Sequence, residues 1–437
     1  MLHCKLYTVY SLPYIRLTVN AEEQQVTLQV APVRQHVSSQ RVADVAGEVR
    51  TGLKALPLSE RVRAGMRIAI AVGSRGINSL TTIVSTVIDE LRALDAEPFL
   101  VPAMGSHGGG TAVGQLAVLR SYNLTPTNLE VPIHSSMETV QIGETPEGMP
   151  VYFDAYAARA DGIIAINRIK EHTAFKGQWE SGLLKILAVG LGKARGAAEI
   201  HNWGVREAMP AAARVILAQM PVLAGVGIVE NGQHCPARIA VLPPDQIEAE
   251  EPELLELARQ LTPRIPLEPL DLLVVQEMGK NISGTGIDLN VIGMWRRTGG
   301  PVVPQINTIA VLDLTSESHG NAIGVGHADL IPQRLRDKID LAATYTNCLT
   351  SHNLPGGKIP ITLPSDREVI EASLAGIDPE RARTIVVRNT LALDRLWISE
   401  ALLSTVAVTP TLKQVGPLRP LTFEPNGVLT MPEWIEQ

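Results

Sequence analysis

The chain has little cysteine and no long uninterrupted apolar run. Its three cysteines, Cys4, Cys235 and Cys348, are far apart and odd in number, so they form neither a disulfide framework nor a zinc-knuckle spacing. The apolar run from Leu183 to Leu191 is interrupted by Lys185 and too short to span a bilayer, and the amino terminus has no apolar signal-peptide core. We therefore expect a cytoplasmic protein without a membrane partner.

An excess of positive charge is also absent. The net charge is −7 and no cluster of lysine and arginine occurs, which argues against a nucleic-acid partner. Hydrophobic residues make up 45% and charged residues 19% of the chain, as in folded globular proteins. Since 437 residues are too many for one average core, we expect two domains.

Strands and helices alternate through the first half of the chain. Continuous apolar runs predict strands at Met66–Val72, Phe99–Val101 and Gly162–Ile166. Apolar residues at helical spacing predict a helix from Leu80 to Leu94, and a further helix is predicted from Tyr152 to Ala160. Because this alternation implies parallel pairing with right-handed crossovers, we expect an α/β fold.

A proline-rich segment marks the expected domain boundary. Three prolines lie between Thr262 and Pro269, where neither a helix nor a strand continues easily. We therefore expect an N-terminal domain over residues 1–262, with cofactor-binding and catalytic roles, and a C-terminal α/β domain over residues 270–437. Both are expected to contain mostly parallel sheets, with an active-site cleft between the two domains.

Four basic side chains follow predicted strands. Arg75, His107, His172 and Lys280 each lie a few residues beyond a buried apolar run, in a loop that contains glycine. Because parallel strands end at one edge of a sheet, we expect all four in one crevice. Histidines act as acids and bases near neutrality, an arginine matches a carboxylate, and a lysine attracts a hydroxyl or keto oxygen. Such a set suits inversion at the α-carbon of a small 2-hydroxy acid.

The stretch after the third predicted strand contains further candidates. Lys185 follows His172, and His201 comes next, after a glycine-rich turn. An imidazole binds zinc, copper, iron or nickel, but one histidine does not hold a metal by itself. Glu180 and Glu199 are candidate partners of these groups, and Glu180 is expected at the surface.

A glycine-rich loop is a candidate phosphate site. Gly105, Ser106 and Gly108 lie between a predicted strand and a predicted helix, where backbone amides can face one phosphate. A tight turn between strand and helix is an equally good interpretation. The chain has neither a P-loop nor a dinucleotide-binding glycine fingerprint, which disfavours an ATPase or an ordinary dehydrogenase.

Together these motifs resemble the nickel-dependent lactate racemase family, which includes racemases and epimerases of 2-hydroxy acids. The likeness runs from about Met66 to Gly326 and is specific between Asn167 and His201. It implies a nickel-pincer nucleotide, that is, pyridinium-3,5-bisthiocarboxylic acid mononucleotide with nickel. In this cofactor two thiocarbonyl sulfurs and a carbon bind the metal. Cofactor-biosynthesis enzymes are then implied as partners.

The resemblance also implies roles for individual residues. Lys185 matches the lysine that tethers the cofactor, and His201 matches the nickel ligand. The remaining matches are His107 and His172 with the acid/base pair, Arg75 with the carboxylate-binding arginine, and Lys280 with the lysine near the substrate. Glu277 stands where the lactate enzyme has a glutamine, which indicates a divergent member with another substrate.

Two other functions stay open. A zinc-dependent hydrolase would use His201, His172 and an acidic residue, although the chain lacks the His-Glu-x-x-His spacing of such enzymes. A noncatalytic protein that binds small carboxylates would use Arg75 and Lys280 alone.

Overall fold

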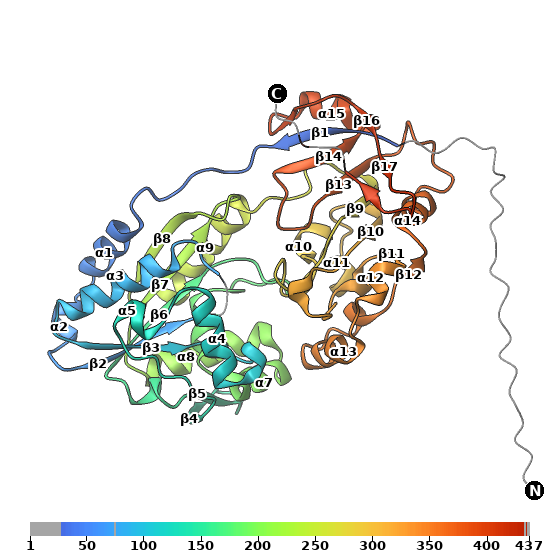
Figure 1. Ribbon diagram of the computed structural model, residues 1–437. Coiled ribbons are helices and arrows are strands. Elements are labelled where there is room, and N and C mark those ends of the chain that lie inside the picture. Colours follow the sequence, from blue (N-terminus) through green and yellow to red (C-terminus); the bar gives the residue numbers. More distant parts are fainter. Residues whose placement is uncertain (1–27, 74–75, 432–433, 435–437) are drawn as a thin grey trace, which may run out of the picture.

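The computed structural model describes residues 28–73, 76–431 and 434, and Figure 1 shows that they form two bodies, which are linked by the segments after β1 and after α9. Arg75, the expected carboxylate-binding residue, lies outside the described residues, as does Cys4. Each body is built around one large sheet. No helix in the described part of the chain is long and apolar enough to cross a membrane.

The first body contains a five-stranded sheet with the order β3-β2-β6-β7-β8. Its strands are β2 (Arg67–Val72), β3 (Glu97–Pro102), β6 (Gly162–Arg168), β7 (Val222–Glu230) and β8 (Pro236–Leu242). The first four strands run parallel, and β8 is antiparallel to β7. The three strands expected from apolar runs are therefore confirmed as neighbours in one sheet.

Helices cover both faces of this sheet. Because side chains alternate along each strand, Ile68 and Ile70 pack on the side of α1 and α3, whereas Ala69 and Ala71 pack on the side of α6 and α8. The helices of this body are α1 (Val45–Ala55), α2 (Leu58–Arg61), α3 (Leu80–Arg92), α4 (Ala112–Ser121), α5 (Pro126–Leu129), α6 (Leu183–Lys185), α7 (Lys193–Asn202), α8 (Val205–Gln219) and α9 (Ile247–Leu261).

One predicted helix is wrong. The segment expected to be helical from Tyr152 to Ala160 begins instead as strand β5 (Pro150–Asp154), which forms an antiparallel hairpin with β4 (Thr139–Glu144). Phe153 is fully buried in the core and Asp154 is fully buried with a cationic partner described below. These long-range contacts override the local helical pattern.

The second body contains the larger sheet, with the order β12-β11-β10-β9-β13-β14-β1-β15 and β16 paired with β1. Strands β9 (Leu270–Val275), β10 (Ile306–Val311), β11 (Leu330–Pro332), β12 (Ile361–Leu363) and β13 (Thr384–Val387) run parallel. Strands β14 (Arg395–Ser399), β1 (Gln29–Gln35), β15 (Leu412–Gln414) and β16 (Arg419–Pro420) pair antiparallel. A separate short hairpin joins β17 (Thr422–Phe423) and β18 (Leu429–Thr430).

Strand β1 belongs to the second body, although the chain continues from it into the first. It comes before every strand of the first body in the sequence, yet it lies between β14 and β15, as the blue strand among orange strands shows in Figure 1. The structure differs here from the expected N-terminal domain over residues 1–262, since residues 29–35 complete the second sheet. The boundary in the proline-rich segment stays a prediction, and that segment is a loop between α9 and β9.

Short helices surround the second sheet. They are α10 (Leu289–Ile292), α11 (Trp295–Thr298), α12 (Gln333–Asp337), α13 (Leu341–Thr350), α14 (Asp366–Ser373) and α15 (Leu403–Val408). Leu289, Val291 and Ile292 of α10 pack on one face of the sheet, and Val369 and Ile370 of α14 pack on the other. The expected α/β fold with mostly parallel sheets is therefore confirmed.

Candidate active site

The two candidate acid/base histidines come from one edge of the first sheet. Val72 at the end of β2 pairs with Pro102 of β3 and with Ile166 of β6, so the loops after these strands start side by side. His107 lies in the loop after β3, and His172 lies in the loop after β6. Lys280 follows β9 of the other sheet, so the expectation of one edge for all four basic residues is wrong for Lys280.

The His107 loop is held in place by the side chain of Gln115. The side chain of Gln115, which is fully buried, donates to the carbonyl oxygens of Gly105 at 2.9 Å and His107 at 3.3 Å. Gly108 has a φ of +67°, and a Cβ at this position would lie 2.6 Å from the carbonyl carbon of Gly114. The loop therefore needs glycine in order to lie against α4, and it leaves the His107 side chain exposed.

The same loop is only partly available for a phosphate. The amide of Gly105 donates to the carbonyl oxygen of Gly190 at 3.0 Å, so this donor is already used inside the protein. The amide of His107 likewise donates to Met104. Phosphate binding by Ser106 and Gly108 stays a prediction.

The His172 loop is organised by Glu180, which was expected at the surface but is completely buried. Its carboxylate accepts hydrogen bonds from the backbone amides of His172 at 2.6 Å and Gly177 at 3.2 Å, and from Nη2 of Arg259 at 2.8 Å. The expectation failed because Arg259 comes from α9, about eighty residues later in the chain. No local sequence pattern indicates this contact.

The His172 ring is held in a neutral state. The amide of Ala174 donates to Nδ1 at 3.0 Å, which places the proton of the neutral ring on Nε2. The ring also packs on Phe175 with 4.4 Å between the ring centroids. Burial lowers the pKa of His172 well below its usual value, and positive charge on Lys185 and other cations lowers this pKa further.

Lys185 and His201 lie on consecutive helical segments. Lys185 ends α6 and is followed by one π-helical turn, Ile186–Gly190, before α7 carries His201. A Cβ at Gly190 would lie 2.7 Å from the carbonyl oxygen of Ala103, so the glycine lets this turn touch the His107 loop. Single π-turns often occur at functional sites.

The two side chains also influence each other electrostatically. Burial lowers the pKa of His201, and the positive charge of Lys185 is the next largest cause. The charge of His201 in turn contributes to the lowered pKa of His172. A neutral imidazole is the form that ligates a metal, and mutual influence of this kind places the three groups in one neighbourhood.

A buried carboxylate supports the helix that carries Lys185. Glu251 of α9 accepts hydrogen bonds through Oε2 from the amides of Leu183 at 2.7 Å and Leu184 at 3.0 Å. Its other oxygen, Oε1, is buried without a hydrogen bond. Burial raises the pKa of Glu251 to about 7, despite the two amides.

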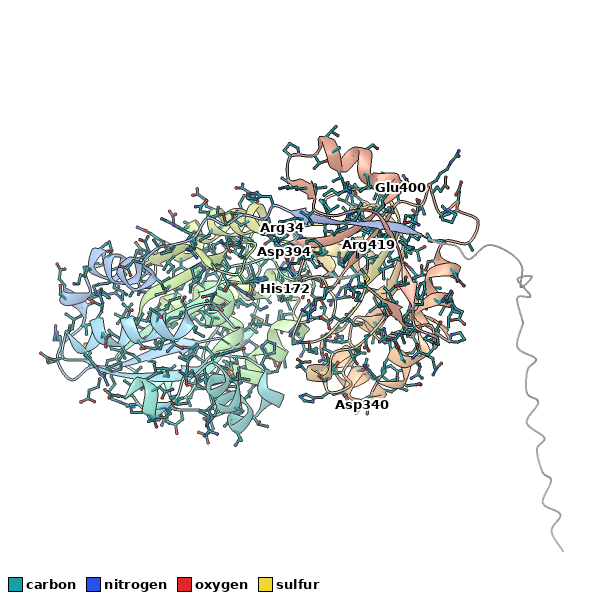
Figure 2. All side chains as sticks on the ribbon, turned by 45° about the horizontal axis from the view of Figure 1, so that its top comes forward. Arg34, His172, Asp340, Asp394, Glu400 and Arg419 are labelled. Carbon is teal, nitrogen blue, oxygen red and sulfur yellow. The ribbon has the colours of Figure 1, made fainter. Side chains whose placement is uncertain are left out.

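The second body contributes contacts to the His172 loop. Asn290 of α10 donates to the carbonyl oxygen of His172 at 3.3 Å, and Arg264 joins Asn290 to Glu171. Figure 2 shows His172 at the junction of the two bodies. Arg297 lowers the pKa of both His172 and His201, and His352 lowers that of His201. Positive groups from both bodies therefore meet around Lys185.

Lys280 takes part from the second body. Its ammonium donates to the carbonyl oxygen of Gly284 at 2.7 Å, and its amide donates to Ser318. Lys280 and Arg297 both lower the pKa of Cys348, while burial of that thiol raises it. Lys280 and Arg297 therefore both lie near Cys348 in the second body.

Comparison with known families agrees with the resemblance in the sequence. Residues 12–210 match the family described as lactate racemase N-terminal domain. No curated protein matches the chain. The resemblance to the lactate racemase family is therefore confirmed over the part of the chain that carries His107, His172, Lys185 and His201.

Comparison with solved structures extends the likeness to both bodies. The lactate racemase apoprotein from Thermoanaerobacterium thermosaccharolyticum is 12% identical with a TM-score of 0.52, over 83% of this chain and 99% of that one. A structure from Thermotoga maritima is 14% identical over 63% of this chain and 72% of that one, with a TM-score of 0.44. At this identity the first match shows a shared fold.

Proposed function

We propose that this chain is a racemase or epimerase of 2-hydroxy acids that works with a lysine-tethered nickel-pincer nucleotide. The observation that carries the proposal is the convergence of His172, Lys185 and His201 in one electrostatic neighbourhood. They lie in the part of the chain that matches the lactate racemase N-terminal domain.

The donor set fits such a cofactor. Among the residues that the structure describes, no group of three His, Cys, Asp or Glu side chains could hold a metal ion. His201 would thus be one ligand of a metal whose other ligands belong to the nucleotide, and soft sulfur donors suit nickel. Lys185 would hold the nucleotide covalently. When bound, this group would supply the hydride chemistry at the α-carbon.

The protein's own residues would handle the proton. One histidine takes the proton of the substrate hydroxyl, and the same or the other histidine returns it after the planar 2-oxo acid has rotated. The low pKa of His172 keeps its ring neutral at pH 7. In this tautomer Nδ1 is occupied and Nε2 already carries a proton, so His172 would donate a hydrogen bond to the substrate oxygen and His107 would take the hydroxyl proton.

Positive charge would hold the substrate carboxylate during the rotation. Arg75 is the expected residue because its planar guanidinium matches a carboxylate, and this assignment stays a prediction. Lys280 would lie nearer the keto oxygen. The convergence of cations from both bodies supports an anionic substrate, since their charges favour its entry.

Chiral chromatography tests the function. The protein is coexpressed with cofactor-biosynthesis enzymes and incubated with single enantiomers of short, aromatic, dicarboxylic and sugar 2-hydroxy acids. We expect inversion at C2 of at least one of them, and its loss in His107→Ala and His172→Ala. Full activity in both variants would contradict the assignment of the two histidines. Tightly bound zinc without inversion would favour a hydrolase, and carboxylate binding without any reaction would favour a binding protein.

A further inference from the structure

Two adjacent arginines in α11 have very different surroundings. The guanidinium of Arg296 donates to the carboxylate of Asp329 at 3.1 and 3.2 Å and to the carbonyl oxygens of His327 at 3.2 Å and Ile306 at 3.1 Å. These contacts connect α11 to strand β10 and to the turn at His327. Arg296 therefore has a structural role that its partners explain.

Arg297 has no comparable set of partners. Its Nη2 donates to the carbonyl oxygen of Ser351 at 3.5 Å, which is a long hydrogen bond. No ion pair among residues 28–73, 76–431 and 434 includes Arg297, although its side chain is half-buried. Burial lowers the pKa of Arg297. Burying a cation without a counter-ion is costly, so such a group is a candidate for ligand binding.

Two buried polar side chains lie close to Ser351, the partner of Arg297. Asn353, two residues after Ser351, is 1% exposed, and His327 is 2% exposed. A hydrogen bond from the Asn353 side chain contributes to the pKa of His327, so these two groups face each other. The turns that carry them are joined by a hydrogen bond from Gly324 to Gly356 at 2.8 Å. Among the described residues of this region, Arg297 is therefore the polar group that is left without a close partner.

The helix that carries Arg297 lies close to the candidate active site. Helix α10 contacts the His172 loop through Asn290, and only two residues separate α10 from α11. The charge of Arg297 also reaches His172, His201 and His327, since it contributes to the lowered pKa of each. Arg297 of the second body therefore lies near histidines of both bodies.

We propose that Arg297 forms an anion subsite for a terminal carboxylate of the substrate, at the end away from the reacting carbon. A guanidinium offers two parallel N–H donors that match a carboxylate. The inference rests on the proposed function and deepens it: the preferred substrates are 2-hydroxy dicarboxylic acids.

Matched substrate pairs test the subsite. The protein coexpressed with cofactor-biosynthesis enzymes is assayed with 2-hydroxybutanedioate against 2-hydroxybutanoate, and with 2-hydroxypentanedioate against 2-hydroxypentanoate. We expect a higher kcat/KM for the dicarboxylates. Arg297→Met should reduce this preference roughly tenfold to a hundredfold, as the loss of a charge-assisted pair implies. Arg297→Lys keeps the charge but loses the planar donors, so it should restore only part of the preference.

Two results would overturn the subsite. One is a wild-type protein without preference for dicarboxylates, and the other is an Arg297→Met variant that loses activity equally on both members of each pair. The matched control is Arg381→Met, because Arg381 is exposed and its ion pair with Asp378 is 4.0 Å long. Thermal unfolding distinguishes a ligand-binding role of Arg297 from a structural role. Because Arg297 has no counter-ion among the described residues, Arg297→Met should not destabilise the protein.

Binding to the protein without substrate turnover keeps the test independent of the proposed function. Butanedioate, which has no hydroxyl group to react, is titrated by calorimetry into the wild-type protein and into Arg297→Met. We expect weaker binding to the variant by roughly tenfold or more. Equal binding would overturn the subsite even if racemisation is observed, whereas weaker binding without racemisation would retain the subsite and reject the racemase.

Discussion

Lys193 and the cations around His172 and His201 differ in how their charge is balanced. Lys193 is completely buried inside the first body, 3.0 Å from the equally buried carboxylate of Asp154, and its ammonium also contacts Gln115 at 3.3 Å. Around His172 and His201, by contrast, every charged group that shifts their pKa is positive. The buried charge of Lys193 is therefore neutralised by Asp154, where it stabilises the fold. Around His172 and His201, where we expect a ligand, no negative group of the described residues contributes to the shifted pKa of either histidine.

The two regions are physically connected. Besides Asp154 and Gln115, the ammonium of Lys193 contacts the carbonyl oxygen of Pro102 at the end of β3. Gln115 in turn holds the carbonyl oxygens of Gly105 and His107. The neutralised lysine therefore supports the loop that presents His107, while α7 leads from Lys193 to His201.

The largest effect is expected from removing Lys193. Lys193→Met keeps the volume but leaves Asp154 buried without its cation, so the free energy of unfolding should fall by about 3–5 kcal/mol. Denaturant unfolding measures this. The double variant Lys193→Met with Asp154→Asn should recover much of the loss, because it also removes the carboxylate charge while the remaining oxygen still accepts from Tyr156 and Ala157. A loss below about 1 kcal/mol in the single variant would show that the pair is not structural.

Glu251 tests the anionic side of the comparison, because it is a buried carboxylate without a cation. Its pKa is about 7 in the folded protein against an ordinary value of 4.5, so between these values the folded state binds more protons than the unfolded chain. The contribution of Glu251 to stability is therefore complete below pH 4.5 and falls as the pH rises to about 7. The total change is about 3 kcal/mol.

The matched variant for this prediction is Glu251→Gln, whose amide oxygen can still accept from Leu183 and Leu184. Its free energy of unfolding relative to wild type should rise by about 3 kcal/mol between pH 4.5 and pH 8. Denaturant unfolding at a series of pH values provides the measurement, and the histidine contributions cancel in the difference. A difference independent of pH would contradict the raised pKa.

A smaller effect is expected at Glu180, which holds the His172 loop without shifting the pKa of His172. Glu180→Ala removes the acceptor of three hydrogen bonds and should cost about 2–3 kcal/mol of stability. Glu180→Gln keeps one acceptor oxygen and should cost less. If the proposed function holds, kcat should fall more than KM rises in Glu180→Ala, because the His172 ring moves. A change in KM alone would place the role of Glu180 in binding.

Local pattern was sufficient to predict much of the first sheet. The runs at Met66–Val72, Phe99–Val101 and Gly162–Ile166 are strands because helices bury both faces of the sheet, which removes the need for polar alternation. The helix from Leu80 was predicted equally well by its spacing. From these strands the placement of His107 and His172 at one edge followed directly.

The remainder depends on contacts between distant parts of the chain. The Glu180 carboxylate is buried because Arg259 reaches it, and β1 lies in the second sheet because its partners are β14 and β15. Lys280 was expected at the same sheet edge as the two histidines, but it follows β9 of the second sheet, since the sequence does not show which strands share a sheet. The contrast between Arg296 and Arg297 is invisible in the sequence for the same reason.

Lys185 lies near both His172 and His201, and we propose that it holds the cofactor there. Intact-protein mass spectrometry after coexpression with the cofactor-biosynthesis enzymes tests it directly, with nickel measured on the same sample. We predict a covalent mass increase with bound nickel in the wild-type protein and no mass increase in Lys185→Ala. An unchanged mass increase in Lys185→Ala, or a wild-type protein that never gains mass, would contradict the account.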